Sequence, residues 1–134
     1  MYDLYAPIIP NVGMGGFMLG MSKAEAENVL ERELRNGRLI RGNALEVYDV
    51  DDALVLYFST KTNRLKGIET RKGYKGLLMG KIGTMTDEDD LMGLDPTLVY
   101  DDFEEFYDSK ENCYQVLAPL PARKAEWISI FTKD

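Results

Sequence analysis

Residues 22–35 have the apolar spacing of a helix, and the residues that follow have the spacing of strands. Within residues 22–35, apolar side chains recur every three to four positions, as on a helix with one buried face. Ser22 and Glu25 form a capping box, in which each side chain can hydrogen-bond the other residue's backbone at the helix start. From Leu45 the apolar spacing is two, the period of a half-buried strand. This change of period constrains the fold most strongly, because it predicts a helix packed on a sheet.

Three segments with strand character follow the predicted helix. Residues 45–50, 53–60 and 64–70 are rich in Val, Leu, Tyr and Phe. The polar residues 51–52 and 61–63 between them are typical of turns. Residues 53–60 are apolar on both faces, so we expect this strand to lie inside the sheet. The three segments predict an antiparallel meander.

The second half of the chain repeats this order. Thr86 is a candidate N-cap. The acidic residues 87–89 that follow it would lie in the first turn of the helix, where negative charge interacts favourably with the positive end of the helix dipole. Asp95 and Pro96 end that helix. Three more strands are predicted over residues 103–108, 112–117 and 125–132.

Matching tetrapeptides suggest that the two halves are a repeat. Glu-Val-Tyr-Asp at residues 46–49 matches Glu-Phe-Tyr-Asp at residues 105–108, in each case after a predicted helix. We predict an internal repeat of residues 14–72 and 78–132, the alternative being chance similarity between two helix–sheet halves. One unit is too small to hold a core by itself. We therefore expect residues 1–134 to form a single α+β domain of two tandem helix–β-meander units, with antiparallel sheet or sheets and the helices packed on one face.

The residue types that are missing exclude most catalytic chemistry. The 134 residues include no histidine, which removes the commonest general base and the commonest metal ligand. Cys113 is the one cysteine, so neither an intramolecular disulfide nor a cysteine-rich zinc site can form. We expect no cofactor and no metal, and we expect that the chain is not an enzyme.

Paired carboxylates leave one enzymatic alternative open, a small hydrolase that depends on Asp or Glu. Asp49, Asp51 and Asp52 form the tightest acidic cluster of the first half. They lie at a predicted hairpin turn, where Asp is common because it hydrogen-bonds nearby backbone. Ser22 is explained by its capping role, since no histidine accompanies it.

Negative charge is concentrated in the second half of the chain. The whole chain has a formal net charge of −7. Residues 1–84 hold 10 acidic and 12 basic side chains, whereas residues 85–134 hold 13 acidic and 4 basic. An acidic surface of this kind disfavours nucleic acid as a partner and favours a basic protein. The alternative for any run of charge is a solvated face.

Aromatic residues alternate with the acidic ones, which is the composition of a protein-binding surface. We predict that the following residues bind a partner: Asp87, Glu88, Asp89, Asp90, Tyr100, Asp101, Asp102, Phe103, Glu104, Glu105 and Asp108.

The segment Gly-Met-Ser-Lys-Ala-Glu at residues 20–25, followed by a meander and repeated, resembles the helix-plus-sheet units of the beta-lactamase inhibitor protein family and of the related small outer-membrane lipoprotein domains. The size, acidity and layout also resemble immunity proteins of bacterial toxin systems, including contact-dependent growth inhibition. Both resemblances imply a protein that acts by binding another protein.

Taken with the acidic second half, these features predict an immunity protein that masks the basic surface of a cognate bacterial toxin, such as a nuclease. An acidic decoy that mimics nucleic acid is the alternative among binding proteins. Residues 1–5 hold no basic side chain of a secretion signal, and no apolar run approaches the roughly 18 residues of a membrane span. We expect a cytoplasmic protein with no membrane partner and leave its oligomeric state open.

Overall fold

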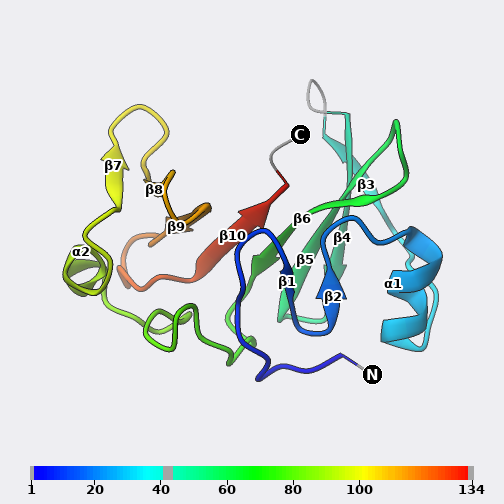
Figure 1. Ribbon diagram of the computed structural model, residues 1–134, viewed down its shortest axis with the longest axis horizontal. Helices are drawn as coiled ribbons and strands as arrows, with labels where there is room; N and C mark the ends of the chain where they lie inside the picture. The colour runs from blue at the N-terminus through cyan, green and yellow to red at the C-terminus, as the bar shows by residue number, and fades with distance from the viewer. Residues whose placement is uncertain (1, 41–43, 133–134) are drawn as a thin grey trace.

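The computed structural model describes residues 2–40 and 44–132, and most of its regular structure is one eight-stranded antiparallel sheet (Figure 1). Each neighbouring pair of strands in this sheet is antiparallel. The order across the sheet is β3 (Arg38–Ile40), β4 (Leu45–Val50), β5 (Leu54–Ser59), β6 (Leu65–Thr70), β10 (Trp127–Phe131), β9 (Tyr114–Leu117), β8 (Phe106–Ser109) and β7 (Val99–Asp101).

The two halves of the chain contribute four strands each, and they meet where β6 pairs with β10. Figure 1 shows β10 and β6 side by side, with β7–β9 beyond one and β3–β5 beyond the other. At this junction Ser129 is the direct partner of Glu69, and Ile130 is the direct partner of Ile68. The duplication of residues 14–72 and 78–132 stays a prediction.

The predicted strands are confirmed. β4 spans the predicted residues, β5, β6, β9 and β10 are shorter than predicted, and β8 begins three residues later and ends one residue later than predicted. The meander in each half nevertheless has four strands instead of three, because β3 and β7 were not predicted. Both are three residues long and lie at the edges of the sheet. β3 is exposed throughout, so it carries no alternation of buried and exposed residues that a sequence could reveal.

The first helix, α1 (Lys23–Leu30), begins as predicted and ends early. Ser22 Oγ accepts a hydrogen bond from the Glu25 backbone N–H at 3.1 Å, and the Glu25 carboxylate accepts one from the Ser22 N–H at 2.8 Å, which confirms the capping box. The predicted end at residue 35 is wrong, because Glu31 adopts a left-handed conformation with φ 61°. The Leu34 N–H then donates to a side-chain oxygen of Glu27 at 2.8 Å, which turns the chain back along the helix.

The second predicted helix is a short 3-10 turn, η1 (Glu88–Asp90), followed by α2 (Leu91–Leu94). The prediction of Thr86 as its N-cap is wrong. Asp87 holds that position without a capping side chain, while Thr86 Oγ1 accepts from the Gly83 N–H at 2.9 Å. The helix ends before Asp95, as predicted. With two short helices and ten strands in its described part, the fold is mostly sheet.

One core cluster joins the sheet to the helices. Leu54, Leu56 and Phe58 on one face of β5 belong to it, and so do Ala26 of α1 and Leu91 of α2. The N-terminal hairpin of β1 (Gly13–Met14) and β2 (Phe17–Met18) adds further residues to the same cluster. β5 is buried on both faces, as predicted for residues 53–60, since Val55 between these residues is buried as well. Three buried apolar residues lie outside the cluster: Leu45, Val47 and Val55.

Candidate functional site

Three of the four predicted acidic residues around η1 form ion pairs within the protein. Arg123 Nε lies 2.9 Å from a carboxylate oxygen of Glu88, and Arg123 Nη2 lies 2.9 Å from one of Asp89. Lys124 pairs with Asp87. The hydrogen bond from Arg123 holds the pKa of Glu88 below its usual range. Basic residues from the loop after β9 therefore compensate part of the negative charge that the sequence assigns to a binding surface.

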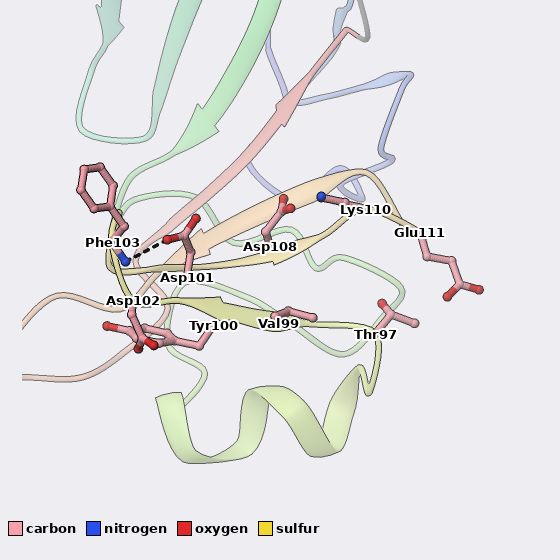
Figure 2. Close-up of a pocket in the computed structure, with 9 residues that line it drawn as sticks. All are labelled: Thr97, Val99, Tyr100, Asp101, Asp102, Phe103, Asp108, Lys110 and Glu111. Atoms are coloured by element: carbon pink, nitrogen blue, oxygen red, sulfur yellow. Dashed lines mark hydrogen bonds between the residues drawn. The ribbon is translucent and has the colours of Figure 1, made fainter.

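The β7–β8 hairpin carries the second group of predicted residues. Asp101 Oδ1 accepts hydrogen bonds from the backbone N–H groups of Phe103 at 2.9 Å and Glu104 at 3.0 Å, which fixes the hairpin turn. The Phe103 side chain lies at this turn and is 90% exposed. Figure 2 shows its ring extending from the end of the hairpin, with the Asp101 carboxylate next to its backbone and the Asp102 side chain on the other side of the turn. An exposed phenylalanine flanked by carboxylates is the composition of a protein contact.

A hollow of about 720 Å³ lies against this hairpin. Figure 2 shows the Asp101 and Asp108 carboxylates and the Lys110 side chain extending from the strands to the same side. Lys110 is the only basic residue among the described residues that line the hollow. The complete lining is Thr97, Val99, Tyr100, Asp101, Asp102, Phe103, Asp108, Lys110 and Glu111.

The remaining predicted residues lie around these two groups. The Tyr100 ring packs edge-on against Tyr107, with 4.9 Å between the ring centroids. Glu105 is exposed and has φ 60°, and its N–H donates to the Asp101 carbonyl across the turn. Asp90 is exposed at the end of η1. The structure thus brings five predicted residues to one hollow (Tyr100, Asp101, Asp102, Phe103 and Asp108) and places Glu104 on a different one.

Beyond the hairpin, hollows continue across the same face of the sheet. One direct cross-strand row runs over this face from β7 to β4: Val99, Asp108, Gln115, Ser129, Glu69, Val55 and Asp49. We call the side of the sheet that carries this row the hollowed face.

Four hollows of the hollowed face adjoin one another, because each shares two lining residues with the next. Hollows of about 720 and 230 Å³ share Asp108 and Lys110. The 230 Å³ hollow shares Gln115 and Ser129 with one of about 160 Å³. The last, of about 210 Å³, shares Glu69 and Trp127 with the 160 Å³ hollow. No described residue before β3 lines any of these four hollows.

Glu69 lies near the middle of the hollowed face with 9% of its surface exposed. One carboxylate oxygen accepts a hydrogen bond from the Tyr57 hydroxyl at 3.1 Å, and the other accepts one from the Ser129 hydroxyl. Burial raises the pKa of Glu69, although these two hydrogen bonds and the nearby Arg71 guanidinium oppose the rise. A buried carboxylate in a hollow with a raised pKa marks a candidate functional position.

Aromatic side chains lie on the two strands that pair with the Glu69 strand. The Arg71 guanidinium carbon lies 5.0 Å from the centroid of the Trp127 ring, a cation–π contact. Tyr57 and Phe131 place their ring centroids 5.4 Å apart over β6. Their position depends on Gly67, because a Cβ there would lie 2.3 Å from Phe131 Cδ1.

The sequence prediction did not include these residues. Concentrated charge distinguishes the acidic run, whereas Glu69 is an isolated acidic residue in a predicted strand. Ile68 and Thr70, the neighbours of Glu69, are fully buried. The sequence offers no signal that Glu69 is buried, because the inner position of the predicted strand 64–70 becomes clear only from the order of the sheet.

Comparisons of the chain with models of known protein families, with characterised proteins and with solved structures find no match. Across residues 2–40 and 44–132, no helix is long and apolar enough to cross a membrane. In that same part of the chain, no group of three or more acidic or cysteine side chains is arranged to hold a metal ion.

Proposed function

We propose that this chain is a non-enzymatic immunity protein, which binds a cognate bacterial toxin and covers a basic surface of that toxin. The observation that carries the proposal is the β7–β8 hairpin, where the 90% exposed Phe103 lies between the exposed acidic residues Asp102 and Glu104. Aromatic anchors surrounded by polar residues dominate the binding energy of many interfaces.

The charges on the hairpin suit a basic partner. Asp102 and Glu104 form no ion pair among the described residues, whereas three of the four acidic residues around η1 do. Charges of opposite sign steer a partner into place and raise its association rate. Burial of the Phe103 ring would add about 2 kcal/mol. We propose that the toxin, a nuclease being one example, meets this hairpin first.

The proposal also covers how the helices pack on the sheet and in which compartment the protein acts. We propose that the helices pack on one face of the sheet, which leaves the hollowed face to the toxin. The inclusion of Ala26 and Leu91 in the core cluster supports this layering. We also propose that the protein acts in the cytoplasm, where it would protect the cell that makes the toxin.

The test uses the product of the gene adjacent to the one that encodes this chain. We expect that product to stop growth when expressed alone and to be neutralised by co-expression of this chain. Phe103→Ala should weaken the complex about tenfold or more, mainly through faster dissociation. Tyr5→Ala is the matched control, because Tyr5 is a 75% exposed aromatic in the N-terminal segment.

Equal weakening by both substitutions, or by neither, would contradict the assignment to the hairpin. A chain that instead competes with DNA for several unrelated basic proteins would be a nucleic-acid decoy.

A further inference from the structure

We propose that the hollow lined by Phe106, Trp127, Glu69 and Glu104 binds an arginine side chain of the partner protein. This inference rests on the proposed protein-binding function and names the group that the hollowed face recognises.

The lining of this hollow comes from both halves of the chain. It encloses about 160 Å³, and β6, β8, β9 and β10 all contribute to it. Glu69 and Ser129 form its polar floor on the β6–β10 pair, and Glu104 reaches it from the β7–β8 turn. Leu117 and its cross-strand partner Trp127 belong to its apolar wall. Two carboxylates and two aromatic rings therefore line one small concave space.

The protein already places a guanidinium group against one of these residues. Arg71 lies over the Trp127 ring at 5.0 Å and lines the neighbouring 210 Å³ hollow together with Glu69. This contact shows that the Trp127 ring accepts a planar cation beside Glu69. Arginine suits such a site better than lysine, because its guanidinium stacks on rings and donates two parallel hydrogen bonds to a carboxylate.

The Glu69 carboxylate can bind a second cation in addition to the nearby Arg71. Each Glu69 oxygen accepts one hydrogen bond, from Tyr57 or Ser129, and a carboxylate oxygen can accept a further one. Among the described residues, both hydrogen-bond donors to Glu69 are neutral hydroxyls and no Lys or Arg side chain forms an ion pair with it. Glu104 is exposed and adds a second negative charge at the rim.

Trp127 provides a direct readout, because it is the only tryptophan in the chain. The probe is N-acetyl-arginine amide, and its neutral counterpart of the same shape is N-acetyl-citrulline amide. We expect a saturable change in Trp127 fluorescence with the arginine probe and at least tenfold weaker binding of the citrulline probe. Equal responses to the two probes, or none to either, would overturn the proposal.

Three variants test the carboxylates. Glu104→Gln changes an exposed residue and should weaken the arginine probe several-fold without affecting folding. Glu69→Gln combined with Glu104→Gln should weaken it at least tenfold, with folding checked by circular dichroism. Glu111→Gln removes the same charge from the 720 Å³ hollow, which shares no lining residue with this one, and should leave the affinity unchanged. Full affinity in Glu104→Gln, or in a folded double variant, would contradict the site.

The outcome is separable from that of the proposed function. If the adjacent-gene product binds this chain but the arginine probe does not, the pocket is wrong and the immunity function stands. If the probe binds as expected but the toxin test fails, the pocket stands and the partner is another arginine-bearing protein.

Discussion

At the scale of single residues, the ionised forms of two buried carboxylates, Asp95 and Glu69, have opposite effects on the stability of the fold. Asp95 is 3% exposed and accepts hydrogen bonds from the Tyr114 hydroxyl at 2.6 Å, from the Asn112 amide at 2.9 Å and from both the N–H and the hydroxyl of Thr97. Burial alone would raise the pKa of Asp95, but these hydrogen bonds outweigh it and lower the pKa to about 2. Glu69 accepts fewer hydrogen bonds, so the effect of burial is the larger one and the pKa of Glu69 is raised.

Asp95→Asn should destabilise the protein by about 2 to 3 kcal/mol at pH 7, because an amide cannot accept from all of these donors. The pKa of Asp95 falls on folding from 3.8 to about 2, so its ionised form stabilises the fold above about pH 4. That contribution is lost as the pH falls from about 4 to 2. In urea unfolding, the difference in unfolding free energy between wild type and variant should decrease by about 2 kcal/mol over that pH range. A gap that stays constant, or an effect no larger than that of the exposed control Asp52→Asn, would contradict this role.

Glu69→Gln should show the opposite pH dependence. Because burial raises the pKa of Glu69 from 4.5, the folded protein holds this proton more tightly than the unfolded chain. Wild type therefore loses stability as the pH rises through the folded pKa, whereas a glutamine has no such loss. We expect the unfolding free energy of the variant, relative to wild type, to increase between pH 4 and pH 8. A difference that decreases with pH would show that Arg71 outweighs the burial of Glu69.

Gly67→Ala should destabilise the fold by about 1 to 3 kcal/mol, because the added methyl group overlaps the Phe131 ring. Gly93→Ala is the control, since nothing lies within 4 Å of a Cβ at Gly93 and the residue is in α2. The control should be neutral or stabilising by up to about 1 kcal/mol. Thermal unfolding of both variants would measure this. Equal effects would mean that the Phe131 ring moves aside at little cost.

At the scale of elements, the long strands and the start of α1 could be predicted because their signals are local. The alternation in β4 and the capping box at Ser22 depend on a few neighbouring residues. The end of α1 and the cap of η1 could not be predicted. They depend on individual hydrogen bonds, such as the one from the Leu34 N–H to Glu27 and the one from the Gly83 N–H to Thr86. Both contacts are short-range, but neither belongs to a periodic pattern or a standard helix-start motif in the sequence.

The same distinction explains the candidate site. Asp101, Asp102 and Phe103 were predicted because charge and aromatic residues are concentrated there in the sequence. Glu69 and Trp127 are 58 positions apart and lie on the same hollow through the pairing of β6 with β10. Only the topology of the sheet brings them together.

Ser22→Ala should cost about 1 kcal/mol through loss of the cap on α1. Asn28→Ala, at an exposed position of the same helix, should be neutral or slightly stabilising because alanine is the better helix former. Urea unfolding of both variants would compare them. A larger loss for Asn28→Ala than for Ser22→Ala would contradict the importance of the cap.

At the scale of the whole molecule, the negative charge divides between two environments. Around η1, Glu88 and Asp89 pair with Arg123, and Asp87 pairs with Lys124. Asp102 and Glu104 on the β7–β8 hairpin have no basic partner among the described residues and lie beside hollows. This division makes the hairpin, and not the whole acidic half, the part of the molecule that we expect to attract a basic partner.

The rate of association with the adjacent-gene product, measured by stopped-flow at several salt concentrations, tests this account most directly. Asp102→Asn combined with Glu104→Gln should slow association about tenfold at low salt and much less at high salt, where charges are screened. Asp52→Asn combined with Glu33→Gln removes the same charge from exposed positions elsewhere and should have little effect. Association of the hairpin variant at the wild-type rate in low salt, or equal slowing by the control, would contradict the assignment of the binding surface to the β7–β8 hairpin.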